Sequence, residues 1–428
     1  MIESEIDHPL RYALVNELHA RPSPQLPVPC TVAFVAFKEP RDAANRDRAA
    51  DHAHLAELVQ RHGGKRPDPA DSHYAGQLGR YDLRWESHTE FMAYAATNPG
   101  KAARPFDPQA AAIFAEEWQG RAPGKRIASV LVHVAELPDN PDDVMDPLDD
   151  WFAADSLAAV WVVQEAALVA GDFRIDANGW MRFAVFVRKG ASPARVGRIV
   201  QRLLELEVYR AMSMLGFQRV RSLSQRLNRL EPRLTAVIDT MSDPESQPEA
   251  VLDELLSIST ELEAEAMGHS FRFGASQAYR ALVHDRIEAL RETRFAGRQM
   301  LSEFMRRRYE PAMRTVTSAE ARIRTMLERA GRAGELLRTR VDVERSAQNQ
   351  ALLTSMDRRA DLQLRLQHTV EGLSVVAISY YAVGLLSYAL YPLSHTVGID
   401  KAMLTALVTP LAVLGVWWAL RRIRRRLH

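Results

Sequence analysis

The chain has 428 residues, enough for two or three domains with a sizeable core, and its 55 basic residues balance its 54 acidic residues. This balance argues against a nucleic-acid partner, which needs a strongly basic surface. Cys30 is the single cysteine, so an internal disulfide and a multi-thiolate metal site are excluded. Its neighbours in "CTVAFVAF" predict a buried thiol in a strand.

The N-terminal segment "MIESEIDHPLRYALVNEL" is acidic and has no uninterrupted apolar stretch, so we expect no secretory signal and a cytoplasmic N-terminus. A short helix is predicted after Asp7, ending before Pro22. This leaves Glu17, His19 and Arg21 at the start of a proline-rich loop. Mixed charges at a helix end can form a ligand pocket, or the same side chains can only hold the loop by ion pairs. The second interpretation is the simpler one.

Residues 1–191 are predicted to form an α+β domain. Strand-like segments alternate with helical stretches at 51–62 and 109–119, and Asn178-Gly179 predicts a tight antiparallel hairpin. No glycine-rich phosphate loop, serine elbow or zinc-ligand spacing is present, and no cofactor is predicted. The predicted strands are 30–37, 80–91, 126–137 and 181–189.

One of these strands carries the second group of candidate site residues. In "RWESHTEF" a two-residue period places Arg84, Glu86, His88 and Glu90 on one face. Two carboxylates beside an imidazole could bind a metal or transfer a proton. Same-face neighbours stand about 7 Å apart, however, so a metal would need further ligands, and a solvated row of ion pairs is favoured.

Residues 192–368 are predicted to be a helical coiled-coil stalk. Ser192 and Pro193 begin the first helix, and a helix over 312–368 runs directly into an apolar segment. Such a long helix needs partners, either the preceding helices or other subunits. The basic run 306–308 is interpreted as a solvated helix face, because no aromatic residues are interleaved with it. A seam with alternating spacings of three and four residues contains Leu252, Leu255, Ser259, Leu262 and Ala266.

Residues 369–428 are predicted to form a transmembrane helical hairpin. The uncharged runs 373–393 and 402–420 are each long enough to span a bilayer, and the link between them is too short for anything but antiparallel helices. Arginines flank the outer ends of both spans, so both termini are expected in the cytoplasm. Trp417 and Trp418 would lie at the inner interface, and the arginines after them would reach the lipid headgroups. These arginines are Arg421, Arg422, Arg424, Arg425 and Arg426.

The first span carries a narrow, mildly polar row formed by Tyr380, Gly384, Ser387 and Tyr391. Small and hydroxylated residues usually mark helix packing in a membrane, and this interpretation is favoured. In a symmetric oligomer the same row could line a pore, with Glu371 forming a ring of carboxylates at its cytosolic mouth. Alternatively, Glu371 pairs with an arginine that ends the second span, Arg421 or Arg422.

Several long strings of the chain are unlikely to recur by chance. They are "NELHARP", "LRWESHTEF", "RTRVDVERSAQNQALLTSMDRRADLQLRLQHTVEGLSVVAISYY" and the closing hairpin. In these strings the chain resembles a bacterial family of membrane-anchored proteins described as domain of unknown function 3422. The resemblance runs almost end to end, and it implies no particular activity. Both groups of candidate pocket residues, from Glu17 to Arg21 and from Arg84 to Glu90, lie inside the shared motifs.

The layout is also similar to that of the CorA-type magnesium transporters. Those pentameric channels join a cytosolic α+β domain, through a long helix, to two C-terminal spans. They carry a Gly-Met-Asn motif after the first span, where this chain has Tyr391-Pro392-Leu393-Ser394. The resemblance therefore implies a shared layout more than magnesium transport.

The sequence predicts a membrane-anchored homo-oligomer at the bacterial inner membrane, with a cytosolic domain that binds an ion or a small molecule. The alternative is an ion channel or transporter whose first span lines the pore. An enzyme using the candidate pocket is the third and least favoured hypothesis.

Overall fold

The computed structural model describes residues 7–8, 10–12, 14–15, 23–40, 46–243, 246–397 and 400–427. The chain divides into two compact units. The first comprises Met1–Glu245 and Asp253–Ala333, and the second comprises Ser246–Leu252 and Gly334–His428.

A nine-stranded mixed sheet forms the centre of the first unit, with the order β2-β3-β4-β1-β5-β8-β7-β6-β9. Neighbouring strands are antiparallel except for β5 and β8, which are parallel. The predicted α+β class is confirmed. The strands are β1 (Cys30–Lys38), β2 (His73–Leu78), β3 (Tyr81–Ser87), β4 (Phe91–Pro99), β5 (Lys125–Glu136), β6 (Ala158–Val162), β7 (Ala167–Ile175), β8 (Met181–Val187) and β9 (Thr293–Arg294).

The apolar segments of the N-terminal half became strands as predicted. β1 is buried along its whole length because it pairs with β4 and β5 and is covered on both faces. Cys30 is a buried core side chain, and burial raises the pKa of its thiol to about 12, so the thiol stays protonated at neutral pH. The Asn178-Gly179 hairpin is confirmed, because Ile175 pairs with Met181 and Gly179 has a positive φ of 82°.

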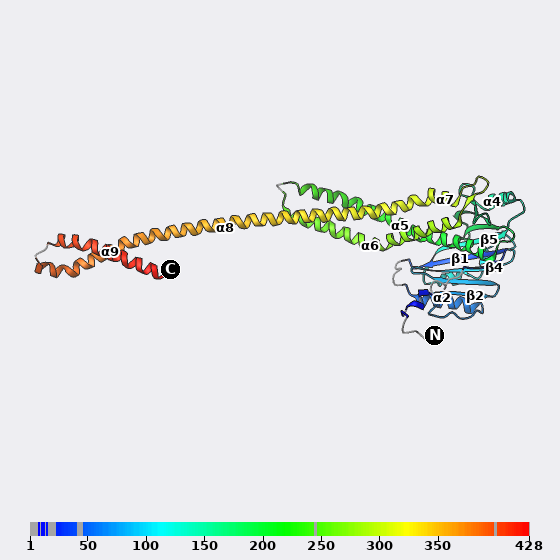
Figure 1. Ribbon diagram of the computed structural model, residues 1–428, viewed down its shortest axis with the longest axis horizontal. Coiled ribbons are helices and arrows are strands. Elements are labelled where there is room, and N and C mark those ends of the chain that lie inside the picture. Colours follow the sequence, from blue (N-terminus) through cyan, green and yellow to red (C-terminus); the bar gives the residue numbers. More distant parts are fainter. Residues whose placement is uncertain are drawn as a thin grey trace. The chain divides into compact units, whose positions relative to one another are not determined.

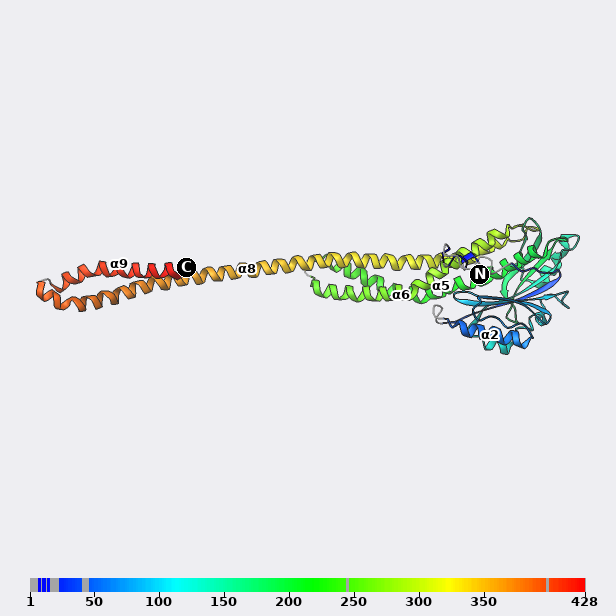
Figure 2. The same cartoon turned by 60° about the horizontal axis from the view of Figure 1, so that its bottom comes forward.

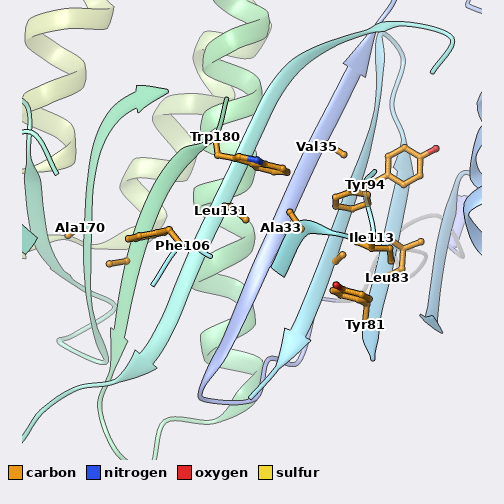
Figure 3. Close-up of a cluster of buried hydrophobic side chains, with 14 of the residues drawn as sticks. Ala33, Val35, Tyr81, Leu83, Tyr94, Phe106, Ile113, Leu131, Ala170 and Trp180 are labelled. Atoms are coloured by element: carbon orange, nitrogen blue, oxygen red, sulfur yellow. The ribbon is translucent and has the colours of Figure 1, made fainter. Parts of the chain in front are cut away.

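Two helical layers cover the two faces of the sheet. On one face lie α2 (Arg48–Arg61), α3 (Glu116–Gly120), α4 (Met145–Trp151) and the 3-10 turns η1 (Pro108–Ala111) and η2 (Pro141–Val144). Figure 2 shows α2 and α5 on opposite sides of the strands. The core beneath α2 joins Ile113, Leu83 and Val35, which Figure 3 shows together. The prediction of one helix over 109–119 is wrong, because this stretch is divided between η1 and α3.

Helices α5 (Pro193–Thr240), α6 (Pro248–Leu290) and the first part of α8 (Glu310–Val397) lie side by side in the first unit (Figure 1). Arg233 on α5 pairs with Glu254 and Glu261 on α6, at 2.9 and 2.8 Å. In α6, Leu255 and Leu262 of the predicted seam are buried, but Ile258 and not Ser259 lies between them in the buried row. The helix α7 (Leu301–Phe304) and the π-helical turn η3 (Met305–Tyr309) lead into α8.

The second unit contains the rest of α8 and α9 (Lys401–Leu427). The stretches Leu301–Pro392 and Lys401–Arg422 each contain a segment long and apolar enough to cross a membrane. Ser379 on α8 and Val408 and Ala412 on α9 are buried, and a cavity between the two helices is lined by residues of both. The two apolar segments therefore pack against each other as a helical hairpin.

Candidate functional site

The motif "RWESHTEF" forms a strand followed by a turn, and the prediction of one continuous strand through Glu90 is wrong. β3 ends at Ser87 and β4 begins at Phe91. The His88 backbone N–H donates to the Phe91 carbonyl oxygen at 2.8 Å, which closes the turn. Arg84 and Glu86 keep the shared face, but the turn redirects the backbone, and Glu90 enters a separate, buried environment.

Arg84, Glu86 and His88 border a pocket between the sheet and α5. Its cavity measures about 70 Å³, room for a few water molecules. The walls are mainly apolar, and polar side chains stand among them from the sheet and from α5. The apolar walls come from Leu26, Val32, Phe34, Phe91, Ala93, Ala95, Val200, Leu204 and Val208; the polar side chains are Arg84, Glu86, His88, Thr97, Gln201, Glu205 and Tyr209.

On the sheet side of the pocket, charged groups form a connected cluster. The His88 Nε2 atom lies 3.3 Å from Glu86 Oε2, and the His88 ring stacks on the Phe91 ring with centroids 4.2 Å apart. Burial lowers the pKa of Arg84, and the nearby Glu86 carboxylate offsets part of this effect. The arrangement places an imidazole of fixed orientation beside a carboxylate, which is suited to binding a polar group or exchanging a proton.

On the helix side, Glu205 is the centre of the polar contacts. Its carboxylate accepts from Gln201 Nε2 at 2.9 Å and pairs with Arg286 of α6. Arg286 lies over the Tyr209 ring, 5.8 Å from its centroid. Burial, and then the Glu205 charge, raise the pKa of Tyr209 to about 12, so its hydroxyl stays protonated and can donate a hydrogen bond.

The segment Pro24–Leu26 covers one side of the pocket and is held against α5. The Leu26 N–H donates to the Pro193 carbonyl at 3.1 Å, and Gly197 lets the Pro24 backbone approach α5. A Cβ atom at position 197 would lie 1.7 Å from the Pro24 carbonyl oxygen. Only glycine permits this contact without moving the backbone.

We therefore expect Gly197→Ala to lower the free energy of unfolding by about 1–3 kcal/mol, because the added methyl group forces the Pro24 backbone away from α5. Chemical denaturation of the full-length protein in detergent measures this. Gly331→Ala is the matched control, since a Cβ atom at that helical glycine would meet open space and alanine should be neutral or stabilising by up to about 1 kcal/mol. Equal effects of the two substitutions would contradict the proposed contact.

Glu90 and Arg272 form a buried ion pair that sequence reasoning missed. Arg272 lies on α6, and its Nη2 atom bonds Glu90 Oε2, with both side chains almost fully buried. Lys38 at the end of β1 is close by: burial and the Arg272 charge lower its pKa, and the Glu90 charge opposes this. The pair joins the sheet to α6 immediately beside the turn that carries His88.

A second ion pair supports the same turn from the α2 side. Arg46 Nη1 lies 2.8 Å from Asp51 Oδ2, and Arg46 Nη2 donates to Ser87 Oγ at 2.9 Å and to the His88 carbonyl at 2.5 Å. Burial raises the pKa of Asp51 to about 6 although the Arg46 charge acts in the opposite direction. The backbone at His88 is therefore positioned by groups from outside its own strand.

The structure describes only some of the other candidate residues. Glu17, His19 and Arg21 lie outside the described residues. Glu371 lies 3.5 Å from Gln367 Nε2 and 3.8 Å from His368 Nδ1 of its own helix, and its pairing with Arg421 or Arg422 stays a prediction. Arg421 and Arg422 lie over the rings of Trp417 and Trp418, at 4.8 and 5.0 Å. The side chains of Arg424, Arg425 and Arg426 are not among those that the structure describes.

Comparison with known families gives one match. The family model described as "protein of unknown function (DUF3422)" matches residues 6–427, almost the whole chain. The chain belongs to the DUF3422 family. A search of curated proteins found no match to this DUF3422 member. Within the described part of the DUF3422 chain, no group of three or more His, Cys, Asp or Glu side chains is placed to hold a metal ion.

Proposed function

We propose that this DUF3422 protein is a membrane-anchored, oligomeric binding protein whose sheet unit holds a small molecule on the cytosolic side of the bacterial inner membrane. The observation that carries the proposal is the pocket between the sheet and α5. It brings Arg84, Glu86 and His88 of the sheet together with Glu205 of α5 around an apolar cavity. An apolar pocket with a few convergent polar groups is the usual form of a ligand site.

The lining suggests the chemistry of the ligand. The apolar walls suit a small apolar group, while the neighbouring side chains carry both signs of charge. This combination fits a small molecule with a compact apolar part and an ionic or strongly polar group. We retain Glu17, His19 and Arg21 in the proposed site on sequence grounds, since Arg21 is three positions before Pro24, which lines the pocket.

The membrane topology rests on the charge distribution. Positive residues near membrane spans are retained on the cytoplasmic side, and arginines flank the outer ends of both apolar segments. The short connection between the segments contains Lys401 beside Asp400. This pattern supports a topology with both termini, and the sheet unit with them, in the cytoplasm. Trp417 and Trp418 then lie at the inner interface, where arginine–indole stacking pairs a cation with an amphipathic ring.

The alternative function is an ion channel or transporter with the CorA-like layout. Tyr380 and Tyr391 favour it, because both are exposed on the first apolar segment and belong to its mildly polar row. In an oligomer that row could face a shared axis. Ion flux in liposomes tests it: Tyr391→Ala or Glu371→Ala should reduce the flux through a pore lined by this row.

For the binding function, we expect small molecules that copurify with the full-length protein to be lost in His88→Ala. The substitution removes the imidazole that stacks on Phe91 and contacts Glu86 at the pocket. Mass spectrometry of the compounds released from purified protein measures the loss, expected to be about tenfold or more if one hydrogen bond to a charged group is removed. His62→Ala is the matched control, because His62 follows α2 and does not line the pocket.

The folded state of both variants is checked by circular dichroism. Equal retention by His88→Ala, His62→Ala and the unmodified protein would exclude this pocket as the binding site.

A further inference from the structure

The part of α8 in the second unit exposes a long row of apolar side chains. Leu352, Met356, Leu366, Val370 and Leu373 each have more than half of their surface exposed, from 58% to 74%. The row continues into the apolar segment with Tyr380, which is 77% exposed. The part of the row from Leu352 to Val370 precedes the apolar segment, and a helix that leaves such a row in water has an unpartnered face.

The row has the spacing of a coiled-coil seam. Alternating steps of four and three residues run from Leu352 to Tyr391 without a break, across the boundary between the charged and the apolar parts of the helix. The polar row predicted in the first span is therefore the C-terminal end of a longer seam. Its members are Leu352, Met356, Arg359, Gln363, Leu366, Val370, Leu373, Ala377, Tyr380, Gly384, Ser387 and Tyr391.

The remaining positions of α8 support the same assignment. The positions directly beside the seam are uncharged, whereas the charged residues of this stretch, with the exception of Arg359, lie away from it. The uncharged flanks are Leu353, Ser355, Ala360, Leu362, Gln367 and Thr369; the outward charges are Asp357, Arg358, Asp361, Arg365 and Glu371. Uncharged flanks widen the apolar face beyond that of a two-stranded seam.

Most of the seam faces away from α9, and its last residue, Tyr391, contacts it: Lys401 of α9 lies 5.7 Å from the centroid of the Tyr391 ring. The helix α9 packs on the side of α8 that carries Ser379, Ala382, Leu386 and Leu390. The residues Tyr380, Gly384, Ser387 and Tyr391 instead border an open groove that α9 edges with Lys401 and Thr405. The hairpin thus leaves the seam from Leu352 to Tyr380 available to another helix.

We infer that the row Leu352–Tyr391 is the contact between copies of this chain, which pack α8 against α8 in parallel and in register as an assembly of more than two subunits. The inference rests on the proposed membrane-anchored oligomer and specifies its interface. Copies inserted in one membrane have their α8 helices in the same direction and at the same depth. A second copy therefore presents an identical seam at the same depth in the membrane. A continuous row of this length needs a partner helix with such a seam.

Two polar residues within the seam contribute to the register. Arg359 and Gln363 interrupt the apolar row at successive positions. Polar side chains at seam positions lower stability but select one alignment of the helices, because any shifted alignment places them against apolar residues. The seam therefore selects one alignment of the helices as well as stabilising their contact.

Disulfide cross-linking of the full-length protein in native membranes tests the interface. The background is Cys30→Ala, which removes the single native cysteine. Leu366→Cys and Val370→Cys place thiols in the seam, and Leu364→Cys is the matched control, an exposed leucine on the opposite face of the same turn. We expect oxidation to produce covalent dimers at least tenfold more efficiently at 366 and 370 than at 364. Equal or preferred cross-linking at 364 overturns the inference.

Mass measurement of the detergent-solubilised protein separates the inference from the proposed function. A mass of three or more subunits without cross-linking at 366 or 370 retains the oligomer and overturns this interface. A monomer with no cross-linking overturns the oligomer itself, and a dimer overturns the inferred assembly size. Leu366→Glu should reduce the assembly to smaller species while Leu364→Glu leaves it intact, and intact assemblies in both variants also contradict the seam.

Discussion

Replacing Glu90 with alanine is expected to lower the free energy of unfolding by about 3–5 kcal/mol. The substitution leaves the Arg272 guanidinium buried without its carboxylate, and a buried uncompensated charge is among the most destabilising changes in a protein core. Denaturant unfolding of the full-length protein in detergent, followed by circular dichroism, measures the change. The effect should exceed that of any exposed ion pair in the same unit.

Two further variants test whether the lost stability comes from the buried, uncompensated charge. Glu57→Ala is the matched control, because Glu57 pairs with Arg61 and Arg121 at an exposed site and such pairs contribute about 0–1 kcal/mol. The double substitution Glu90→Leu with Arg272→Met removes both charges and should recover most of the lost stability. A loss in Glu90→Ala no larger than in Glu57→Ala would show that the pair is not buried as described.

The Asp51 carboxyl is expected to give the protein a distinct pH dependence. Its pKa in the folded state is about 6, compared with about 4 in an unfolded chain. The folded state therefore binds the proton more tightly, so this group stabilises the fold at low pH and loses that contribution as the pH rises from 4 to 6. A pKa difference of about 2 units corresponds to about 3 kcal/mol.

The difference in unfolding free energy between the unmodified protein and Asp51→Asn isolates this contribution, because the other ionisable groups are common to both proteins. Relative to the variant, the unmodified protein should lose about 2 kcal/mol between pH 4 and pH 7, because part of the full contribution is already lost at pH 4. Asp155→Asn is the control, since it removes a carboxylate from an exposed pair with Arg174. The difference in unfolding free energy between the unmodified protein and this variant should change by less than about 1 kcal/mol over the same pH range. A flat difference for Asp51→Asn would contradict a raised pKa.

Much of the fold was predictable from local patterns. The buried strand at Cys30, the Asn178-Gly179 hairpin and the two apolar helices all follow from short-range rules on alternation, turn residues and hydrophobic length. The same short-range rules did not predict the break between η1 and α3. The turn at 88–90 was also missed, because the alternation of polar and apolar residues continues through it although the backbone does not.

The candidate site was predictable only in part. Alternating polar and large apolar residues marked Arg84, Glu86 and His88 as candidates on one face of a strand, and these residues border the pocket beside α5. The solvated row of ion pairs was the favoured interpretation of the pattern, and a role of these residues in binding stays a prediction. Their α5 partners Gln201 and Glu205 were not predicted. On a long helix with many charged residues, nothing in the spacing distinguishes a side chain that faces the sheet from one that faces solvent.

The sequence by itself determined the class of fold, the position of the strands β1, β5 and β8 and the two membrane-length helices, because these depend on interactions between residues close in the chain. Only the tertiary structure decided that Glu90 is buried against Arg272, 182 positions away, and that His88 shares a pocket with Glu205. Such contacts depend on which surfaces the folded chain brings together, and their energy comes from excluding water around charges. No spacing in a single sequence records that burial.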